Sequence, residues 1–378
     1  MASTLIPPAA TQRRYRLIST DAHVNEPPDL WRSRVPQKFA DRAPRMEHFE
    51  RGDAWVLDGV KDPINFGMNA CAGMPRDKVS AWVRWDDIRR GGYDPVARAA
   101  EQDEDGVDAE IMFPTPRLSY HMFAIKEPDF HLALIQAYND WLCEYVAAAP
   151  DRFGGIALLP NRGVEQAVAE VQRLAGRPGI RGVLLGAYPH GSLAPEPQDD
   201  ALWAALQELD LPVHIHVSMV QDQPAAHTGA ANANDLRYQL RIHDAPGRVM
   251  QFVFTGIFDR FPGLKLVMVE VDAGWVPYFK EQTDNRYQRL LPTGELRLAR
   301  LPSEYIDEHV WWSFITDAFA VQNRHAVGVE RMMWSSDYPH LGADWPNSLR
   351  TIAASFSGVP AAERDRMLAG NAVELYKF

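Results

Sequence analysis

Eight short runs of apolar residues, spread along most of the chain, are the strongest pattern in the sequence. Each run is nearly continuous in its apolar character, whereas a half-solvated strand would alternate apolar and polar residues. This continuity is typical of parallel strands that are buried on both faces of a sheet. We therefore predict strands at residues 15–21, 109–114, 154–160, 180–186, 212–217, 264–270, 310–315 and 331–336.

Amphipathic stretches lie between most of these runs. Residues 164–176, for example, carry valine and leucine at the three- and four-residue spacing of a helix with one apolar face. The predicted helices are residues 129–149, 164–176, 199–209, 234–260, 275–289 and 318–327. Eight strands with a helix after most of them predict a (β/α)8 TIM barrel, because open parallel sheets usually have fewer strands.

The segment between the first two predicted strands is too long for a simple strand–helix unit. Residues 30–100 are rich in proline, glycine, tryptophan and charge. Long segments of this kind in compact domains are usually functional or disordered, and Trp55, Trp82 and Trp85 favour order because such large apolar groups gain by burial. We expect one barrel domain over residues 1–378, with residues 30–100 as an insertion over the barrel mouth, and a lid role for it is a hypothesis.

Composition and charge exclude several classes of protein. Of the 378 residues, 46% are hydrophobic and 24% charged, which is enough for a sizeable core. The net charge is −11 and no run of lysine or arginine forms a phosphate-binding stripe, so nucleic acid is not an expected partner. Cys71 and Cys143 form no CxxC pair, and no stretch approaches the roughly 20 apolar residues of a membrane span. A cytoplasmic protein that acts on a small molecule is expected.

Acids and histidines stand at the carboxyl ends of four predicted strands, where a TIM barrel carries its chemistry. The pairs are Asp21 and His23, His214 and His216, Glu270 and Asp272, and Asp337 and His340. In the first three pairs the residues are two apart and so lie on one face of a strand, and several of these groups should therefore meet at the mouth. An unpaired carboxylate buried there would be costly, and a cation or hydrogen-bonding partners are therefore expected.

Each pair alone also has a structural explanation. Asp21 could cap the following turn, and either histidine of the second pair could be a hydrogen-bonded core residue. Asp337 could cap the final segment, although its place directly after an apolar strand favours a ligand or proton-transfer role. Glu270 is harder to explain structurally, because glutamate is seldom buried without a partner.

Four segments, in order along the chain, carry a more specific resemblance. They read DAHVNEPPDLW, LPVHIHV, GIFDRFPGLKLVMVEVDAGWVPY and WSSDYPH, and together they span residues 18–340. The chain resembles the amidohydrolase superfamily, in particular the group that contains aminocarboxymuconate-semialdehyde decarboxylase and related aromatic-acid decarboxylases. This resemblance implies a single divalent metal ion held by Asp21, His23, His216 and Asp337, with Asp337 also moving a proton. Relatives of this kind are often dimers, so a homodimer is possible.

The chain departs from the family pattern at one position. Many relatives carry a histidine at the end of the sixth strand, where this sequence has Glu270. A glutamate can exchange protons, but it adds negative charge that would repel a substrate carboxylate. We therefore name Asp337 and Glu270 as catalytic candidates. Glu26, in the loop after the first strand, is expected to order that loop.

Nitrogen and oxygen ligands without sulfur suit a divalent ion, with Zn²⁺ or Mn²⁺ expected. Two reactions use the same ligands: hydrolysis, in which metal-activated water attacks a carbonyl, and nonoxidative decarboxylation of an aromatic or dienoic acid, a carbon–carbon lyase reaction. Glu270 favours hydrolysis slightly. A catalytically idle binding protein is a third, minor alternative. The candidate substrate-binding residues are Trp31, His214, Trp275 and His340, which suit a planar substrate, although both tryptophans could equally be packing residues.

Overall fold

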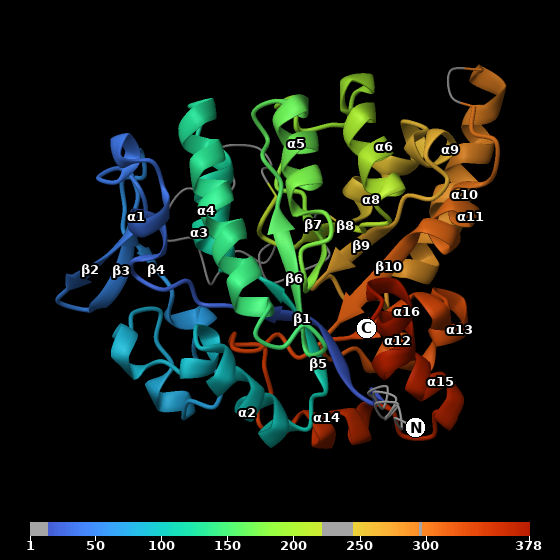
Figure 1. Ribbon diagram of the computed structural model, residues 1–378. Helices are drawn as coiled ribbons and strands as arrows, with labels where there is room; N and C mark the ends of the chain where they lie inside the picture. The colour runs from blue at the N-terminus through green and yellow to red at the C-terminus, as the bar shows by residue number, and fades with distance from the viewer. Residues whose placement is uncertain (1–13, 221–244, 295–296) are drawn as a thin grey trace, which may run out of the picture.

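The computed structural model describes residues 14–220, 245–294 and 297–378, and these form a closed parallel barrel (Figure 1). Its eight strands follow the order of the chain around the sheet, and every paired neighbour is parallel. They are β1 (Ile18–His23), β5 (Ala109–Phe113), β6 (Phe153–Leu158), β7 (Ile180–Leu184), β8 (Val213–His216), β9 (Leu266–Val269), β10 (Val310–Phe314) and β11 (Met332–Trp334). The predicted TIM barrel and all eight predicted strands are confirmed.

The strands are buried on both faces, as their continuous apolar runs predict. Every residue of the eight barrel strands is buried except Arg181, which is half-buried. The predicted bounds differ from the observed ones by a few residues. Strand β1 continues past Asp21, because Ala22 and His23 pair with Met112 and Phe113 of β5. Both predicted ligands of the first pair therefore lie on the strand itself.

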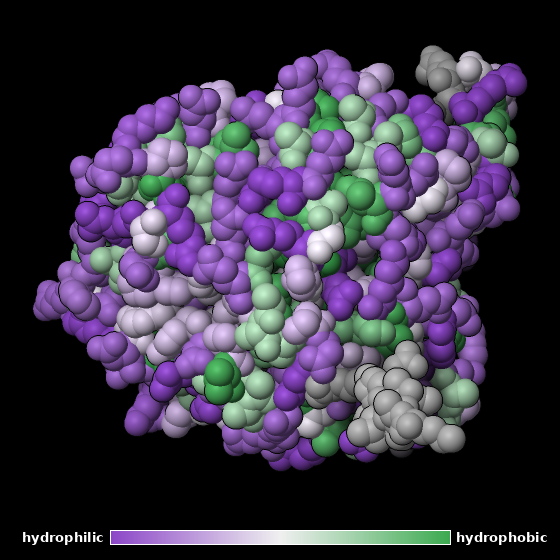
Figure 2. All heavy atoms as spheres, viewed as in Figure 1, coloured by the Kyte–Doolittle hydropathy of each residue, from purple (hydrophilic) through white to green (hydrophobic). Residues whose placement is uncertain are grey.

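Helices surround the strands (Figure 1). They are α1 (Leu30–Arg34), α2 (Pro95–Asp105), α3 (Pro116–Ala124), α4 (Pro128–Val146), α5 (Val164–Leu174), α6 (Asp200–Glu208), α8 (Ala245–Phe254), α9 (Ile257–Arg260), α10 (Val276–Leu290), α11 (Pro302–His309), α12 (Ala318–Gln322), α13 (Arg324–Val327), α14 (Ser348–Ser355), α15 (Ala361–Asp365) and α16 (Asn371–Tyr376). In Figure 2, hydrophilic residues cover most of the face in view and hydrophobic residues show only in small patches. Apolar residues of helices such as α4 and α5, for example Leu134 and Val171, are buried.

Four of the six predicted helices are single helices, namely α4, α5, α6 and α10. The helix predicted at residues 234–260 lies partly outside the described residues, and its described part is divided into α8 and α9. The prediction of one continuous helix at residues 318–327 was wrong. This segment is split into α12 and α13 at Asn323, whose main-chain and side-chain amides both donate to the carbonyl of Phe319 at the end of α12.

The insertion after β1 is an ordered structure beside the barrel. It contains a small antiparallel sheet of β2 (Arg45–Phe49), β3 (Gly52–Val56) and β4 (Ile64–Asn65), which lies next to α1 (Figure 1). Trp55 is buried and packs edge-on against Trp31, with ring centroids 5.4 Å apart, whereas Trp82 and Trp85 are half-buried. The insertion therefore carries its own tryptophan packing.

One stretch of the insertion reaches the loop that follows β11. The amide of Leu341 donates to the carbonyl of Met68, and the amide of Ala72 donates to the carbonyl of Pro339. This contact brings the insertion to the carboxyl ends of β11 and β1, and its role as a lid stays a prediction. Among the described residues, no helix has the length and apolar character that crossing a membrane requires.

Candidate metal centre

The four predicted metal ligands meet at the carboxyl ends of β1, β8 and β11. Asp21, His23, His216 and Asp337 are all almost completely buried. The Oδ1 atom of Asp21 lies 3.2 Å from Nε2 of His23 and 3.3 Å from Nε2 of His216. Nε2 of His23 lies 3.5 Å from Oδ1 of Asp337. Three segments far apart in the sequence thus bring Asp21, His216 and Asp337 each to within 3.5 Å of Nε2 of His23.

Hydrogen bonds to main-chain carbonyls fix how both imidazoles face this point. Nδ1 of His23 lies 2.9 Å from the carbonyl oxygen of Pro114, and Nδ1 of His216 lies 2.7 Å from that of Val217. A carbonyl can only accept, so each Nδ1 carries a hydrogen and each neutral ring presents the lone pair of Nε2. The two Nε2 atoms lie 3.3 Å apart and face Oδ1 of Asp21.

Such a group of lone pairs is what a cation requires. Oδ2 of Asp21 is also buried and accepts no hydrogen bond from any described residue. Neutral imidazole nitrogens, each oriented by a carbonyl on its far side, and carboxylate oxygens are ligands of Zn²⁺ and similar divalent ions. One ligand atom from each of Asp21, His23 and His216 lies within 4.8 Å of the others. The residues present therefore fit a single divalent metal ion.

The pKa shifts of the cluster reflect its competing charges. Burial alone would raise the pKa of Asp21, but His216 and then His23 hold it well below its usual range. Burial and the neighbouring His340 lower the pKa of His23 to about 4, against the opposing effect of Asp21. Burial would lower the pKa of His216 as well, but Asp21 and then Glu270 raise it to about 9. Without an ion, His216 is therefore the protonated ring and His23 the neutral one, and a bound cation would replace the proton on Nε2 of His216.

Three residues at the strand ends adopt a backbone conformation that side chains seldom tolerate. Glu270, Asp272 and Asp337 have φ values of +58°, +55° and +55°. Positive φ at such residues costs about 1–3 kcal/mol each and is concentrated at functional sites. Oε2 of Glu270 lies 3.9 Å from Nε2 of His216, and a carboxylate oxygen of Glu270 lies within 4.8 Å of those of Asp21 and Asp337. Both predicted catalytic carboxylates therefore lie at the cluster.

His340 belongs to the same cluster. Its ring stacks on that of His23, with centroids 3.6 Å apart, and its Nδ1 lies 3.0 Å from Oδ1 of Asp337. Its Nε2 lies 3.3 Å from the side-chain amide nitrogen of Asn69 in the insertion. His340 thus contacts two predicted ligands. The sequence reasoning missed Asn69, since nothing in its local pattern shows that the insertion returns to this loop.

The other predicted substrate-binding residues have the contacts of packing residues. Nδ1 of His214 bonds the carbonyl of Val183 at 3.1 Å and its Nε2 bonds the hydroxyl of Tyr376 at 2.9 Å, while burial lowers its pKa to about 3. His214 would reach a substrate only after one of these bonds broke. The indole of Trp31 is fully buried and donates to the carbonyl of Leu134. The indole of Trp275 donates to Val271 and packs edge-on against Trp312.

Glu26 orders a loop that supports a ligand. Its carboxyl group accepts hydrogen bonds from the amide of Thr115 at 2.8 Å and from the hydroxyl of Thr115 at 2.5 Å. Thr115 follows Pro114, whose carbonyl orients the ring of His23. Glu26 thus acts on His23 through Pro114, consistent with its expected loop-ordering role.

Comparison with known families decides which family the chain represents. A family model described as amidohydrolase matches residues 20–378. The chain belongs to this amidohydrolase family. The match spans nearly the whole chain and confirms the resemblance that the four sequence segments indicated. This amidohydrolase is therefore a member of an enzyme family, and its cluster can hold one divalent ion.

Several curated relatives of this amidohydrolase are decarboxylases. Gamma-resorcylate decarboxylase of Polaromonas sp. JS666 is 25% identical over 261 residues, which cover 64% of this chain and 75% of the relative. The 2-amino-3-carboxymuconate-6-semialdehyde decarboxylase of Dictyostelium discoideum is 24% identical and covers 75% of this chain and 76% of the relative. The comparisons therefore favour the decarboxylase alternative over hydrolysis.

Solved structures share the fold. An amidohydrolase of Mycobacterium avium subsp. paratuberculosis K-10 aligns with a TM-score of 0.74 at 23% identity, over 97% of this chain and 98% of that one. A dihydroxybenzoic acid decarboxylase of Polaromonas sp. JS666, solved with manganese and 2-nitroresorcinol, aligns with a TM-score of 0.65 at 20% identity, over 96% and 97% of the two chains. At these identities the likeness shows the common barrel.

Proposed function

We propose that this protein is a nonoxidative decarboxylase of a small aromatic or dienoic carboxylic acid, dependent on one divalent metal ion such as Mn²⁺ or Zn²⁺. The observation that carries the proposal is the buried cluster in which Asp21, His216 and Asp337 each lie close to Nε2 of His23. The names of several relatives support the reaction class, and one related decarboxylase was solved with manganese. The homodimer and the cytoplasmic location stay predictions.

In this proposal Asp21, His23, His216 and Asp337 hold the ion. When bound, the ion supplies a Lewis acid that attracts the substrate carboxylate and an adjacent oxygen. Pro114 and Val217 keep the two imidazoles in the binding tautomer through their carbonyls. The burial of all four side chains excludes water from their charges, which strengthens every electrostatic contact at the site.

Decarboxylation requires one proton at the carbon that loses CO₂. The electrons of the breaking carbon–carbon bond remain on that carbon, and the proton forms the new C–H bond. Asp337 is the proposed donor, and His340, 3.0 Å from its Oδ1, orients its carboxyl group. Glu270, which directly follows β9, lies at the same cluster and is a second group that can hold a proton. A protonated Glu270 would not repel the substrate carboxylate.

The test is CO₂ release by the metal-loaded protein. We would offer a panel of hydroxybenzoates and dienoic acids, and in parallel a panel of amides and esters. We expect CO₂ from at least one acid, and loss of that activity in Asp337→Asn. The control is Asp284→Asn, which alters an aspartate on α10 that likewise accepts hydrogen bonds, from Ser303. Turnover of amides or esters without any CO₂ would overturn the proposal in favour of hydrolysis.

A further inference from the structure

A buried arginine outside the metal cluster touches both sides of it. Arg98 of α2 has a fully buried side chain, and its Nε donates to Oε2 of Glu110 on β5 at 2.6 Å. The side chain of Gln102 donates to the same oxygen at 2.7 Å. A buried ion pair is costly unless it is well hydrogen-bonded, so its presence beside the barrel requires a reason.

The first reason is a contact with the main chain of His23. Nη1 of Arg98 donates to the carbonyl of His23 at 2.9 Å and to the carbonyl of Gly91 at 3.2 Å. The amide of His23 donates in turn to the carbonyl of Tyr338 at 2.6 Å. The predicted ligand is therefore held on both sides of its backbone, by Arg98 and by Tyr338.

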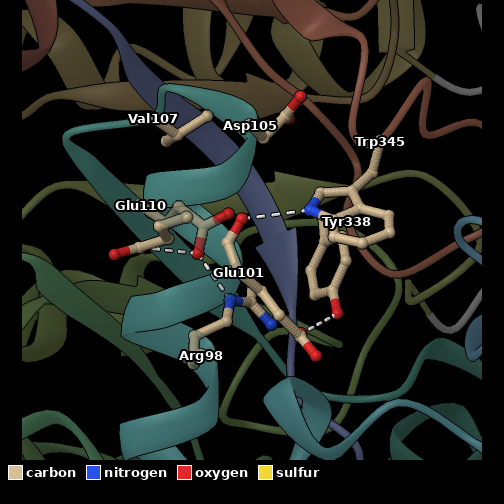
Figure 3. A pocket seen from close by; sticks show the side chains of 8 residues that line it. Arg98, Glu101, Asp105, Val107, Glu110, Tyr338 and Trp345 are labelled. Carbon is tan, nitrogen blue, oxygen red and sulfur yellow. Dashed lines mark hydrogen bonds and ion pairs between the residues drawn. The ribbon is translucent and has the colours of Figure 1, made fainter.

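The second reason is a contact with Tyr338, which directly follows Asp337. The guanidinium carbon of Arg98 lies 4.4 Å from the centroid of the Tyr338 ring, in the geometry of a cation–π contact. The hydroxyl of Tyr338 donates to the carboxylate of Glu101, also on α2. Figure 3 shows Arg98 and Glu101 on this helix, with Glu110 on one side and Tyr338 on the other.

These contacts lie where the barrel closes. Strand β1 meets the segment after β11 at a single bridge, between Ala22 and Tyr338, and main-chain hydrogen bonds there join His23 to Tyr338 and Asp337 to Asp21. Side chains supply part of the remaining pairing, since the hydroxyl of Ser19 accepts from the amide of Ser336 and that of Thr20 bonds the carbonyl of Trp334. The proposed ligands on β1 and after β11 therefore lie on a seam held by two main-chain hydrogen bonds and a few side chains, and not by a continuous ladder.

The small crevice around Arg98 is not the substrate site. Its lining includes Arg98, Glu101, Glu110, Tyr338 and Trp345, and none of Asp21, His23, His216, Glu270 or Asp337. Trp345 closes it by donating to the carbonyl of Glu101 (Figure 3). Arg98 thus acts through the backbone of His23 and the ring of Tyr338.

We infer that Arg98 is a positioning residue, which fixes the spacing between His23 and Asp337 across the closing seam and thereby sets the metal affinity. This inference rests on the proposed metal-dependent function. Glu110 anchors Arg98, and both must be present for the guanidinium to reach His23 and Tyr338 together. A lysine keeps the charge opposite Glu110, but it lacks the forked donors that bond two partners at once.

The test compares Arg98→Lys with wild type by Mn²⁺ titration of the metal-free protein. We expect the dissociation constant to rise about 10- to 100-fold, the usual effect of removing a group that orients a ligand. The matched control is Arg173→Lys, which alters a guanidinium that bonds the buried Glu170 on α5, outside the seam. The control should bind Mn²⁺ as wild type does.

A second readout does not depend on the metal. Amide hydrogen exchange of peptides covering residues 18–26 and 335–341 should be faster in metal-free Arg98→Lys than in wild type or Arg173→Lys. Glu110→Gln keeps the shape of the anchor without its charge. It should raise the Mn²⁺ dissociation constant and the exchange rate as Arg98→Lys does, but by less. If Arg98→Lys does not fold, Glu110→Gln alone tests the inference.

The outcomes separate the two proposals. A wild-type protein that binds no Mn²⁺ would defeat the proposed function, and exchange at the seam would then decide the role of Arg98 alone. Unchanged exchange in Arg98→Lys, or an equal change in Arg173→Lys, would overturn the positioning role even if wild type binds Mn²⁺. Weaker binding together with faster exchange, both confined to the Arg98 and Glu110 variants, supports it.

Discussion

Replacing Glu26 tests whether a residue that touches no metal ligand supports the site through the loop after β5. Glu26→Met keeps the length of the side chain but removes both acceptors for Thr115. Glu26→Gln keeps an oxygen that accepts from the amide of Thr115. Its NH₂ group can donate a hydrogen bond to the hydroxyl oxygen of Thr115. Burial raises the pKa of Glu26, against the lowering effect of its hydrogen bonds from Thr115.

The magnitude follows from the hydrogen bonds that each variant loses. In Glu26→Met the amide of Thr115 remains buried without an acceptor, which costs about 1–3 kcal/mol. The hydroxyl of Thr115 can still turn to the carbonyl of Val24, 3.3 Å away, and recovers part of its bond. We therefore expect the free energy of unfolding to fall by about 2–4 kcal/mol in Glu26→Met and by less than about 1 kcal/mol in Glu26→Gln.

Two assays follow this change. Urea denaturation gives the free energy of unfolding, and Mn²⁺ titration shows whether the displaced Pro114 carbonyl loosens the ring of His23. We expect about 10-fold weaker binding in Glu26→Met and nearly unchanged binding in Glu26→Gln. Equal stabilities of the two variants would refute the hydrogen-bond argument. A destabilised Glu26→Met with unchanged Mn²⁺ affinity would refute the link to His23.

Two further predictions concern buried histidines that are not proposed metal ligands. His131 accepts a hydrogen bond from the amide of Asn161, and burial lowers its pKa to about 4. The contribution of the neutral ring to the free energy of unfolding is therefore complete above pH 6.5, the pKa of a histidine in the unfolded chain. It falls by about 1.4 kcal/mol per pH unit as the pH drops from 6.5 to 4. Urea denaturation should show that the free energy of unfolding falls by about 2 kcal/mol less in His131→Gln than in wild type when the pH is lowered from 7 to 5. Equal falls in the two proteins would contradict this reasoning. Tyr376→Phe removes the partner of His214 and should lower the free energy of unfolding by about 1–2 kcal/mol. It should leave Mn²⁺ affinity unchanged, and weaker binding would show that His214 does reach the ion.

The parts of the fold that could be predicted are those set by local pattern. Continuous apolar runs indicated all eight strands, because a buried parallel strand requires apolar side chains on both faces. The strand ends then indicated the cluster, since the carboxyl ends of β1, β8 and β11 must meet in a closed barrel. The break at Asn323 was not predicted, because the apolar pattern does not show where one helix ends and the next begins.

Contacts between distant segments could not be predicted. His214 and His216 look alike in the sequence, and they differ because Tyr376, from the last helix, bonds one of them inside the barrel. Asn69 and Arg98 reach the site from the long segment between β1 and β5, and no local pattern shows which part of the barrel this segment contacts. Trp31 and Trp275 could not be assigned from sequence for the same reason, since packing partners such as Trp55 and Trp312 are known only from the structure.

The most direct test of the central claim compares the two histidines of β8 by Mn²⁺ binding, measured by electron paramagnetic resonance. Asp21, His23, His216 and Asp337 are proposed to hold one ion, while His214, two residues from His216, bonds Val183 and Tyr376. We predict one bound Mn²⁺ per chain in wild type and in His214→Gln, and loss of binding in His216→Gln. Tight binding retained in His216→Gln, or no binding in wild type, would contradict the account.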